Sequence, residues 1–169
     1  FIGSIAGGVF RSSDNGTNWT QVNNGLSNLN ILSITVKDSM VIVGTDGGEG
    51  IYKSINRGNN WIATNSGLKN KQIPCLSVHN SKVYAGTYGR GLFYSDDNGN
   101  NWKSLNIGLT YNDVGSLFIN GGTLLVGSDG GVFRTTDNGL YWSSVNTGLS
   151  SVDINSFVLS KSGIFAGSY

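Results

Sequence analysis

The sequence predicts an all-β fold made of four repeats of about 41 residues, in which each repeat forms a four-stranded antiparallel sheet. Four tryptophans, at positions 19, 61, 102 and 142, stand 42, 41 and 40 residues apart. Between them, short runs of β-branched and aromatic residues alternate with Gly- and Asn-rich turns, which is typical of strands joined by tight connections. No stretch has the apolar period of a long helix.

Each tryptophan ends an eight-residue phrase with Ser or Thr at its first position, Asp or Asn at its third and Gly at its fifth. A Gly-Leu pair follows every phrase, and an apolar run that ends in Gly-Ser or Gly-Thr recurs with the same period. The repeat therefore spans the whole chain. The residues that define the four phrases are Ser12, Asp14, Gly16, Trp19, Ser54, Asn56, Gly58, Trp61, Ser95, Asp97, Gly99, Trp102, Thr135, Asp137, Gly139 and Trp142.

Each repeat contains four strand-like runs, which we name A to D. In the second repeat they are residues 31–36, 40–45, 50–54 and 61–64, and in the third they are residues 74–78, 82–87, 91–95 and 102–105. Four short antiparallel strands in a period of about 40 residues are the signature of a propeller blade. The sequence therefore predicts a β-propeller built of four-stranded antiparallel blades.

The phrase falls on the turn between strands C and D, and its residue types suit that position. The Asp or Asn side chain can accept hydrogen bonds from backbone N–H groups of the turn. The Gly can adopt positive φ without steric cost. The Trp opens strand D, where we expect its ring to lie between neighbouring blades and its N–H to reach a nearby carbonyl. The phrase is thus expected to be structural.

The pattern S/T-x-D/N-x-G-x-x-W, once per repeat, resembles the Asp-box, or bacterial neuraminidase repeat, of sialidase, xyloglucanase, sortilin-type and photosystem-assembly propellers. All four copies match, and Asn56 is the one that departs from Asp. The resemblance implies a propeller fold and a bacterial source. The resemblance does not indicate a particular function, because the same repeat occurs in glycosidases, receptors and assembly factors.

The alignment of the repeats predicts the boundaries of the blades. Residues 1–169 form a single propeller array in which 1–23 is a half blade with strands C and D, 24–64, 65–105 and 106–145 are full blades, and 146–169 is a half blade with strands A and B. Residues 1–5 and 165–169 fall on the same stretch of the repeat. Three arrangements stay open: a closed four-blade monomer, a dimer that shares an eight-blade ring, or a segment of a longer chain whose further blades close the ring. Some partner must cover the unpaired edges.

The composition excludes several classes of protein. Charged residues make up 12% of the chain, the formal net charge is +1, and Lys and Arg do not cluster, which argues against a nucleic-acid partner. No apolar run approaches the roughly 20 residues of a membrane helix, so we expect no membrane insertion. The bias toward Asn, Ser, Thr and Gly favours a secreted or cell-surface protein.

The chain offers little chemistry for catalysis through metals or nucleophiles. With one His and one Cys it lacks the residues for a His/Cys zinc site, and we expect no metal and no cofactor. Catalysis by a Ser-His-Asp triad would have to use His79, which lies at an A–B turn and is expected to be a solvated histidine. Cys75 cannot form a disulfide within the chain and is expected to be a buried, inert thiol.

The candidate ligand site lies in the loops where the four repeats differ. Because strands alternate in direction, the B–C and D–A loops emerge on one face of the array and the phrases emerge on the other. Loops vary while blades repeat, so the first face is expected to bind the ligand. The polar and aromatic side chains of these loops are Asp46, Glu49, Lys69, Lys71, Tyr88, Arg90, Tyr111, Asp113, Asp129 and Asp153.

Two functions follow from these loops. The favoured hypothesis is a non-catalytic scaffold or binding module for a protein or glycan partner. The alternative is a glycoside hydrolase of xyloglucanase-like type, in which Asp46 and Asp129 would be the two carboxylates that flank a sugar bond. These aspartates occupy equivalent positions two repeats apart, in a stretch similar to the one that holds a catalytic Asp in xyloglucanase-type propellers. Sialidases need an arginine triad, and Arg90 is the one arginine on these loops.

Overall fold

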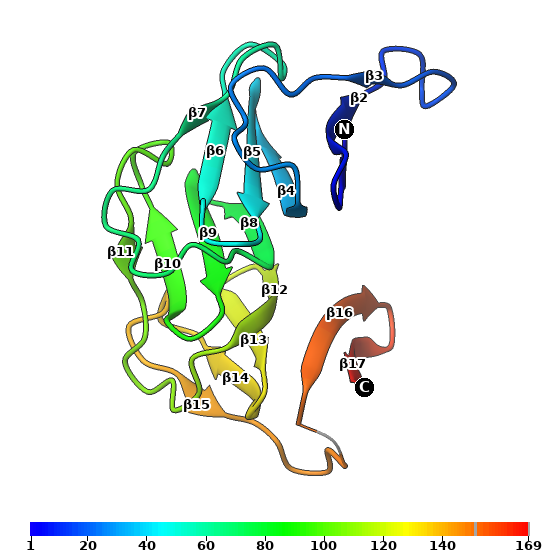
Figure 1. Ribbon diagram of the computed structural model, residues 1–169. Coiled ribbons are helices and arrows are strands. Elements are labelled where there is room, and N and C mark those ends of the chain that lie inside the picture. The colour runs from blue at the N-terminus through cyan, green and yellow to red at the C-terminus, as the bar shows by residue number, and fades with distance from the viewer. Residues whose placement is uncertain (151, 169) are drawn as a thin grey trace.

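The computed structural model describes residues 1–150 and 152–168. Ser151 and Tyr169, both of which belong to the expected unit 146–169, lie outside the described residues. The described residues form seventeen β-strands in five antiparallel sheets and no helix. The sheets follow one another around an arc, and the two ends of the chain lie at the two ends of that arc (Figure 1).

We number the sheets 1 to 5 in chain order. Sheet 1 contains β1 (Ile2–Ser4), β2 (Gly8–Arg11) and β3 (Thr20–Gln21). Sheet 2 contains β4 (Ile31–Lys37), β5 (Met40–Thr45), β6 (Ile51–Ser54) and β7 (Ile62–Ala63). Sheet 3 contains β8 (Cys75–His79), β9 (Lys82–Thr87), β10 (Gly91–Ser95) and β11 (Lys103–Ser104). Sheet 4 contains β12 (Val114–Asn120), β13 (Thr123–Ser128), β14 (Gly131–Thr135) and β15 (Ser143–Ser144). Sheet 5 contains β16 (Ile154–Ser160) and β17 (Gly163–Ser168).

The strand boundaries follow the expected runs closely. Strands β5, β9 and β10 begin and end at the expected residues. The last strand of each full sheet is only two residues long, and it begins directly after the tryptophan. Residues 1–23, expected to hold two strands, hold three, since Ile2–Ser4 pairs with β2 in the register Ile2↔Phe10.

The first strands of the sheets, β4, β8, β12 and β16, lie toward the concave side of the arc, and the last strands, β7, β11 and β15, lie on its outer side (Figure 1). The register of the first strand shifts by one residue near its beginning in sheets 2, 4 and 5. Such irregularities bend a strand and re-aim its side chains. In sheet 3 the first strand begins after Pro74, which has no N–H to give to a ladder.

The core lies between successive sheets. Ile42 and Ile51 of sheet 2 form one buried cluster with Phe93 and Trp102 of sheet 3. The next cluster joins sheets 3 and 4, and it contains Tyr84 and Trp142. Burial of one large apolar side chain is worth roughly 1.5–3 kcal/mol, so each sheet depends on its neighbours for stability.

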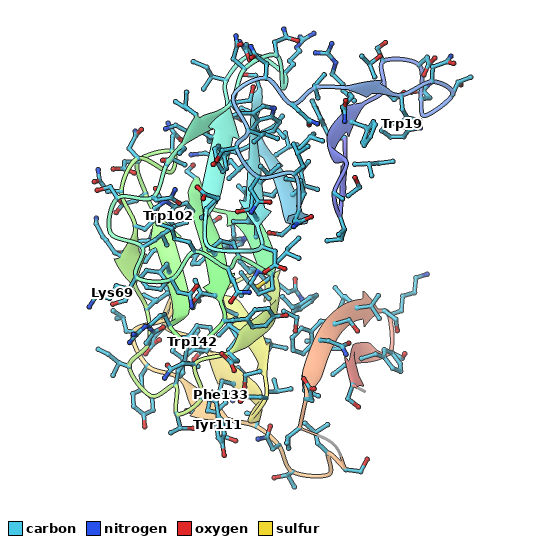
Figure 2. All side chains as sticks on the ribbon, in the orientation of Figure 1. Trp19, Lys69, Trp102, Tyr111, Phe133 and Trp142 are labelled. Atoms are coloured by element: carbon cyan, nitrogen blue, oxygen red, sulfur yellow. The ribbon has the colours of Figure 1, made fainter. Side chains whose placement is uncertain are left out.

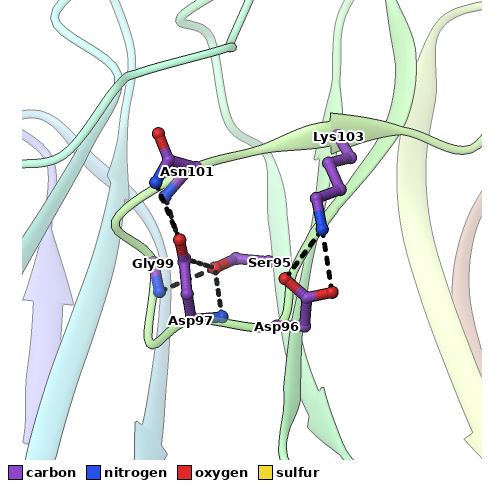
Figure 3. Close-up of polar contacts among 6 residues, drawn as sticks. All are labelled: Ser95, Asp96, Asp97, Gly99, Asn101 and Lys103. Carbon is purple, nitrogen blue, oxygen red and sulfur yellow. Dashed lines mark hydrogen bonds and ion pairs between the residues drawn. The ribbon is translucent and has the colours of Figure 1, made fainter.

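The phrases form the turns between the third and fourth strands, and we call them the repeat turns. In the third repeat turn the Ser95 hydroxyl donates to Asp97 Oδ1 at 2.7 Å and accepts the Gly99 N–H at 2.8 Å (Figure 3). Asp97 also accepts the backbone N–H of Asn101 at 2.9 Å and its side-chain amide at 2.8 Å. These contacts, led by the Asn101 side chain, hold the pKa of Asp97 well below its usual value.

The other repeat turns share the hydroxyl contacts and the backbone N–H contact to the Asp or Asn side chain. The backbone N–H of Asn18 is the largest cause that lowers the pKa of Asp14 to about 2, and the Thr135 hydroxyl is the largest cause that lowers the pKa of Asp137. Asn56 serves in place of Asp in the second turn, where its Oδ1 accepts the Asn60 N–H at 2.9 Å. One neutral amide oxygen is therefore enough to hold the turn.

The tryptophans of the second, third and fourth repeat turns are 3%, 3% and 1% exposed. Each indole N–H donates to a carbonyl of the preceding sheet: Trp61 to Val22 at 2.7 Å, Trp102 to Thr64 at 2.9 Å and Trp142 to Leu105 at 2.8 Å. Trp19 has no preceding sheet among the described residues. It is 42% exposed and donates to Gly16 of its own turn at 3.1 Å.

Candidate functional site

The loops after the second and fourth strands meet at one rim of the array, as expected. In sheet 2, the Asp46 N–H donates to Asn30 at 2.9 Å. In sheet 3, the Tyr88 N–H donates to Gln72 at 3.3 Å, and the Gly91 N–H donates to Asn112 of the following loop at 2.7 Å. These backbone hydrogen bonds join loops that are far apart in sequence. The variable loops next to sheets 2, 3 and 4 therefore contact one another in pairs, on the face opposite the repeat turns.

The rim contains a cavity of about 470 Å³ that crosses the beginnings of sheets 2 to 5. Four of the candidate ligand residues line it: Tyr88, Asp113, Asp129 and Asp153. Five of the remaining lining residues lie in the first strands or just before them, and they are Leu32, Pro74, Gly115, Ile154 and Asn155. The sixth, Ser128, ends the second strand of sheet 4. The fold thus gathers three carboxylates from three different loops around one opening.

The carboxylates of this cavity influence one another. Burial is the largest cause that raises the pKa of Asp129, and the negative charges of Asp113 and Asp153 raise it further. No Lys or Arg belongs to the described residues that line the cavity. The cavity therefore carries negative charge without a cation in its wall. Such a site is suited to a ligand that brings positive charge or several hydroxyl donors.

Asp46 lies outside this cavity, although its position in the repeat corresponds to that of Asp129. Its Oδ1 accepts the Gln72 side-chain amide at 2.7 Å and the Gly47 N–H at 2.8 Å. The Gln72 contact is the largest cause that lowers the pKa of Asp46. Asp46 thus ties the loop of sheet 2 to the loop that leads into sheet 3, and the two aspartates have different surroundings.

The other loop candidates are distributed along the rim. Lys69 and Arg90 line a second cavity of about 210 Å³, and Lys69 lies on the outer side of the array (Figure 2). The Tyr111 ring packs against Phe133 at 6.4 Å between centroids and covers Gly130. The Ser27 hydroxyl donates to Glu49 at 3.4 Å, and Lys71 is exposed. The ten candidates therefore do not form one site.

Sequence reasoning missed the contribution of the first strands to the cavity. Pro74, Gly115 and Asn155 were not candidates, because only the polar and aromatic side chains of the B–C and D–A loops were selected. Their position directly after the D–A loops could have identified them. Residues at that position lie at the beginning of the first strand of a sheet, next to the rim.

The residues considered for metal and nucleophile chemistry lie apart from the cavity. His79 ends β8 and pairs with Lys82 across the turn on the opposite face. Burial raises the pKa of the Cys75 thiol to about 12, and this thiol points toward the Val114 carbonyl at 3.7 Å. Among residues 1–150 and 152–168, no three His, Cys, Asp or Glu side chains form a group that could hold a metal ion. The described part of the chain has no helix long and apolar enough to cross a membrane.

Several solved structures are similar to the chain, among them two GH74 enzymes and YCF48. An ancestral GH74 enzyme matches 97% of this chain with a TM-score of 0.76 and 19% identity, and the match covers 25% of that enzyme. YCF48 bound to a D1 peptide matches 97% of this chain with a TM-score of 0.73 and 12% identity, over 57% of that protein. The GH74 xyloglucanase from Xanthomonas campestris matches 91% of this chain with a TM-score of 0.68 and 15% identity, over 29% of that enzyme.

The similarity to these structures shows the fold of the chain, which is that of a β-propeller protein with antiparallel four-stranded sheets. The chain spans between a quarter and about three fifths of the lengths of these three structures. No protein-family model and no curated protein sequence matches the chain.

Proposed function

We propose that this chain is a non-catalytic Asp-box propeller module that binds a protein or glycan partner at the rim cavity. One observation carries the proposal: Asp113, Asp129 and Asp153, which belong to loops that differ among the repeats, line one cavity together with the Tyr88 ring. Carboxylates accept hydrogen bonds from sugar hydroxyls or ammonium groups, and an aromatic ring offers a flat apolar surface. A cavity with these groups binds by contact and needs no reactive residue.

The repeat organisation belongs to the same proposal. We assign residues 1–169 to one array of four Asp-box repeats, with a half blade at each end, as the repeat phase predicts. The polar composition supports a secreted or cell-surface location, and the style of the repeat supports a bacterial source. A neighbouring structure, YCF48, is bound to a peptide, and two others are GH74 enzymes, so both ligand classes have a precedent on this fold.

A glycoside hydrolase is the second candidate function. The observation that favours it is the raised pKa of Asp129, since the general acid of a glycosidase must carry a proton. Its partner would be Asp46, which stays charged. Because Gln72 and Gly47 hold the Asp46 carboxylate in its own loop and Asp46 does not line the cavity, binding is the better supported function.

The test is a binding titration of neutral xyloglucan oligosaccharides and of a lysine-rich peptide by calorimetry. We expect one of the two probes to bind the native chain and the Asp129→Asn variant to bind it at least about tenfold more weakly, which corresponds to about 1.4 kcal/mol. The matched control is Asp38→Asn, because Asp38 carries the same charge on an exposed turn of the opposite face and has a positive φ that Asn also adopts.

Two outcomes would contradict the proposal. If neither probe binds, or if Asp129→Asn and Asp38→Asn weaken binding equally, the cavity is not the binding site. If the native chain releases reducing ends from the oligosaccharide and both Asp46→Asn and Asp129→Asn abolish the release, the chain is a hydrolase.

A further inference from the structure

Two junctions between successive sheets share a contact made by a basic side chain of the third strand. At the junction of sheets 1 and 2, Arg11 Nη1 donates to a carbonyl and to a side-chain amide oxygen of the second repeat turn, at 2.9 and 3.0 Å. At the junction of sheets 2 and 3, Lys53 Nζ donates to the Asn98 carbonyl at 3.1 Å and to Asn100 Oδ1 at 2.5 Å. Because the contact recurs, Lys53 has a structural role at its junction.

The junction of sheets 2 and 3 also carries a second cation, which the recurring contact does not require. Lys37, which ends β4, donates its Nζ to Asn98 Oδ1 at 2.6 Å and to the Ser81 carbonyl at 2.6 Å. The residues that end the first strands of sheets 3, 4 and 5 are His79, Asn120 and Ser160. A lysine at this position is therefore particular to sheet 2, and it binds the same asparagine as Lys53.

The two lysines line a cavity of about 340 Å³ on the face of the repeat turns. Its other lining residues are Asp38, Ser39, Met40, Ile55, Asn98 and Asn100. Lys53 is 7% exposed, so its charge is largely withdrawn from water. Within residues 1–150 and 152–168, neither lysine forms an ion pair with a carboxylate. Asp38 is the one acidic residue of the described wall, so the cavity keeps one positive charge in excess.

Several hydrogen-bond donors of this cavity have no acceptor in the described part of the chain. An ammonium group has three N–H donors, and Lys37 and Lys53 each use two of them. The Asn98 side-chain oxygen accepts from Lys37, and neither its amide NH₂ group nor the Ser39 hydroxyl has a partner among the described residues. Two like charges beside one asparagine repel each other, and partial burial strengthens the repulsion. An anion in the cavity would relieve this repulsion and accept the free donors.

We propose that this cavity, which we call the lysine pocket, binds the carboxylate of an acidic peptide segment. A carboxylate carries one negative charge and two acceptor oxygens, which match the excess charge and the free N–H donors of Lys37 and Lys53. The lysine pocket lies on the face opposite the rim cavity and contains none of its residues. The inference is therefore independent of the ligand of the rim cavity.

The surroundings of the lysine pocket favour a peptide over an acidic sugar. Ile55 lines the cavity and is 72% exposed, so it offers an aliphatic contact to an apolar residue beside the acidic one. An aromatic ring would offer a sugar a flat apolar surface, and none belongs to the described residues that line the cavity. An acidic residue with an aliphatic neighbour thus fits both the charge and the apolar edge of the pocket.

The test is an NMR titration of the isotope-labelled chain with a capped peptide that contains one glutamate between two leucines, and with the same peptide containing glutamine. We expect the glutamate peptide to shift the amide signals of residues 37–40 and 98–100, and the glutamine peptide to leave them unchanged. Lys37→Gln should weaken binding at least about tenfold, because it removes one of two charge-assisted hydrogen bonds. Lys161→Gln is the matched control, since Lys161 is exposed and follows the first strand of sheet 5 on the same face.

A further variant separates loss of charge from loss of structure. Lys37→Arg should keep most of the binding, because it retains the positive charge at the pocket. If neither peptide binds, if both bind equally, or if Lys37→Gln and Lys161→Gln have the same effect, the lysine pocket does not bind a carboxylate. Tighter binding of glucuronic acid than of the glutamate peptide would also overturn the proposal, because it would assign the pocket to an acidic glycan. Tighter binding of inorganic phosphate would replace the carboxylate with a different anion.

Discussion

The same substitution in two copies of the repeat turn separates the contribution of burial from that of the turn itself. Trp102 is 3% exposed and packs against sheet 2, whereas Trp19 is 42% exposed and donates its indole N–H to its own turn. Both end the same phrase and precede a two-residue strand. Trp102→Ala and Trp19→Ala thus remove the same atoms from two different environments.

The expected losses differ about twofold. A fully buried aromatic side chain removes about 200 Å² of surface from water, which is worth about 5 kcal/mol at roughly 25 cal/mol per Å². We expect Trp102→Ala to lower the free energy of unfolding by about 4 kcal/mol, the usual range for an aromatic side chain in a core, and Trp19→Ala to lower it by about 2 kcal/mol. Trp102→Phe should cost about 1–3 kcal/mol, because the Thr64 carbonyl loses its donor.

Urea denaturation followed by far-UV circular dichroism measures these values. Equal losses for Trp102→Ala and Trp19→Ala would refute the reasoning, since they would mean that the turn and not the junction determines the cost. A negligible loss for Trp102→Phe would show that the hydrogen bond to the preceding sheet does not contribute.

Two further predictions concern the repeat turns and the junctions. The folded-state pKa of Asp97 lies below its usual value of 3.8. The stability that its ionised form contributes is therefore present above about pH 4 and is lost as the pH falls below it. Asp97→Asn should reduce this acid sensitivity in urea melts and keep most of the stability, because the Asn56 side chain makes the equivalent contact in the second turn. Gly108→Ala should destabilise the chain far more than Gly148→Ala, although both have positive φ, because only at Gly108 would the new Cβ lie 2.3 Å from the Trp142 carbonyl.

Each of these predictions has a clear contrary outcome. An Asp97→Asn variant that loses as much stability as Asp97→Ala at neutral pH would show that the charge, and not the acceptor geometry, holds the turn. For the glycines, the cost of positive φ is roughly 1–2 kcal/mol at both positions, so it cancels in the comparison. Equal thermal midpoints for the two alanine variants would mean that the junction adjusts without cost.

The local structure of the repeats was predictable because it depends on short-range chemistry. The hydroxyl, carboxylate and glycine of residues 95–99 are close in sequence, and their hydrogen bonds need only a turn of the right shape. Strand β9 follows from six residues with strand propensity between two turn signals. The same reasoning placed the loops on one rim, which the Tyr88 and Gly91 backbone contacts bear out.

The composition of the rim cavity was not predictable in the same way. Asp46 and Asp129 have equivalent positions in the repeat, yet Gln72 binds only Asp46, while Asp113 and Asp153 act on Asp129. Gln72 and Asp153 come from the loops that lead into the next sheet, and Asp113 comes from the loop that leads into sheet 4 itself. No local sequence pattern indicates which of these loops contact one another. Equivalence in sequence therefore did not imply equivalence in chemistry.

By itself the sequence determined the repeat, the turns and the alternation of strands, because each of these depends on residues within one period of about 41 positions. Only the tertiary structure decided which tryptophans are buried and which carboxylates share a cavity. Both properties depend on the neighbouring sheet, so Trp19 and Trp102, identical in their local sequence roles, differ from 42% to 3% in exposure. Burial and electrostatic coupling belong to pairs of sheets, and a single repeat does not contain them.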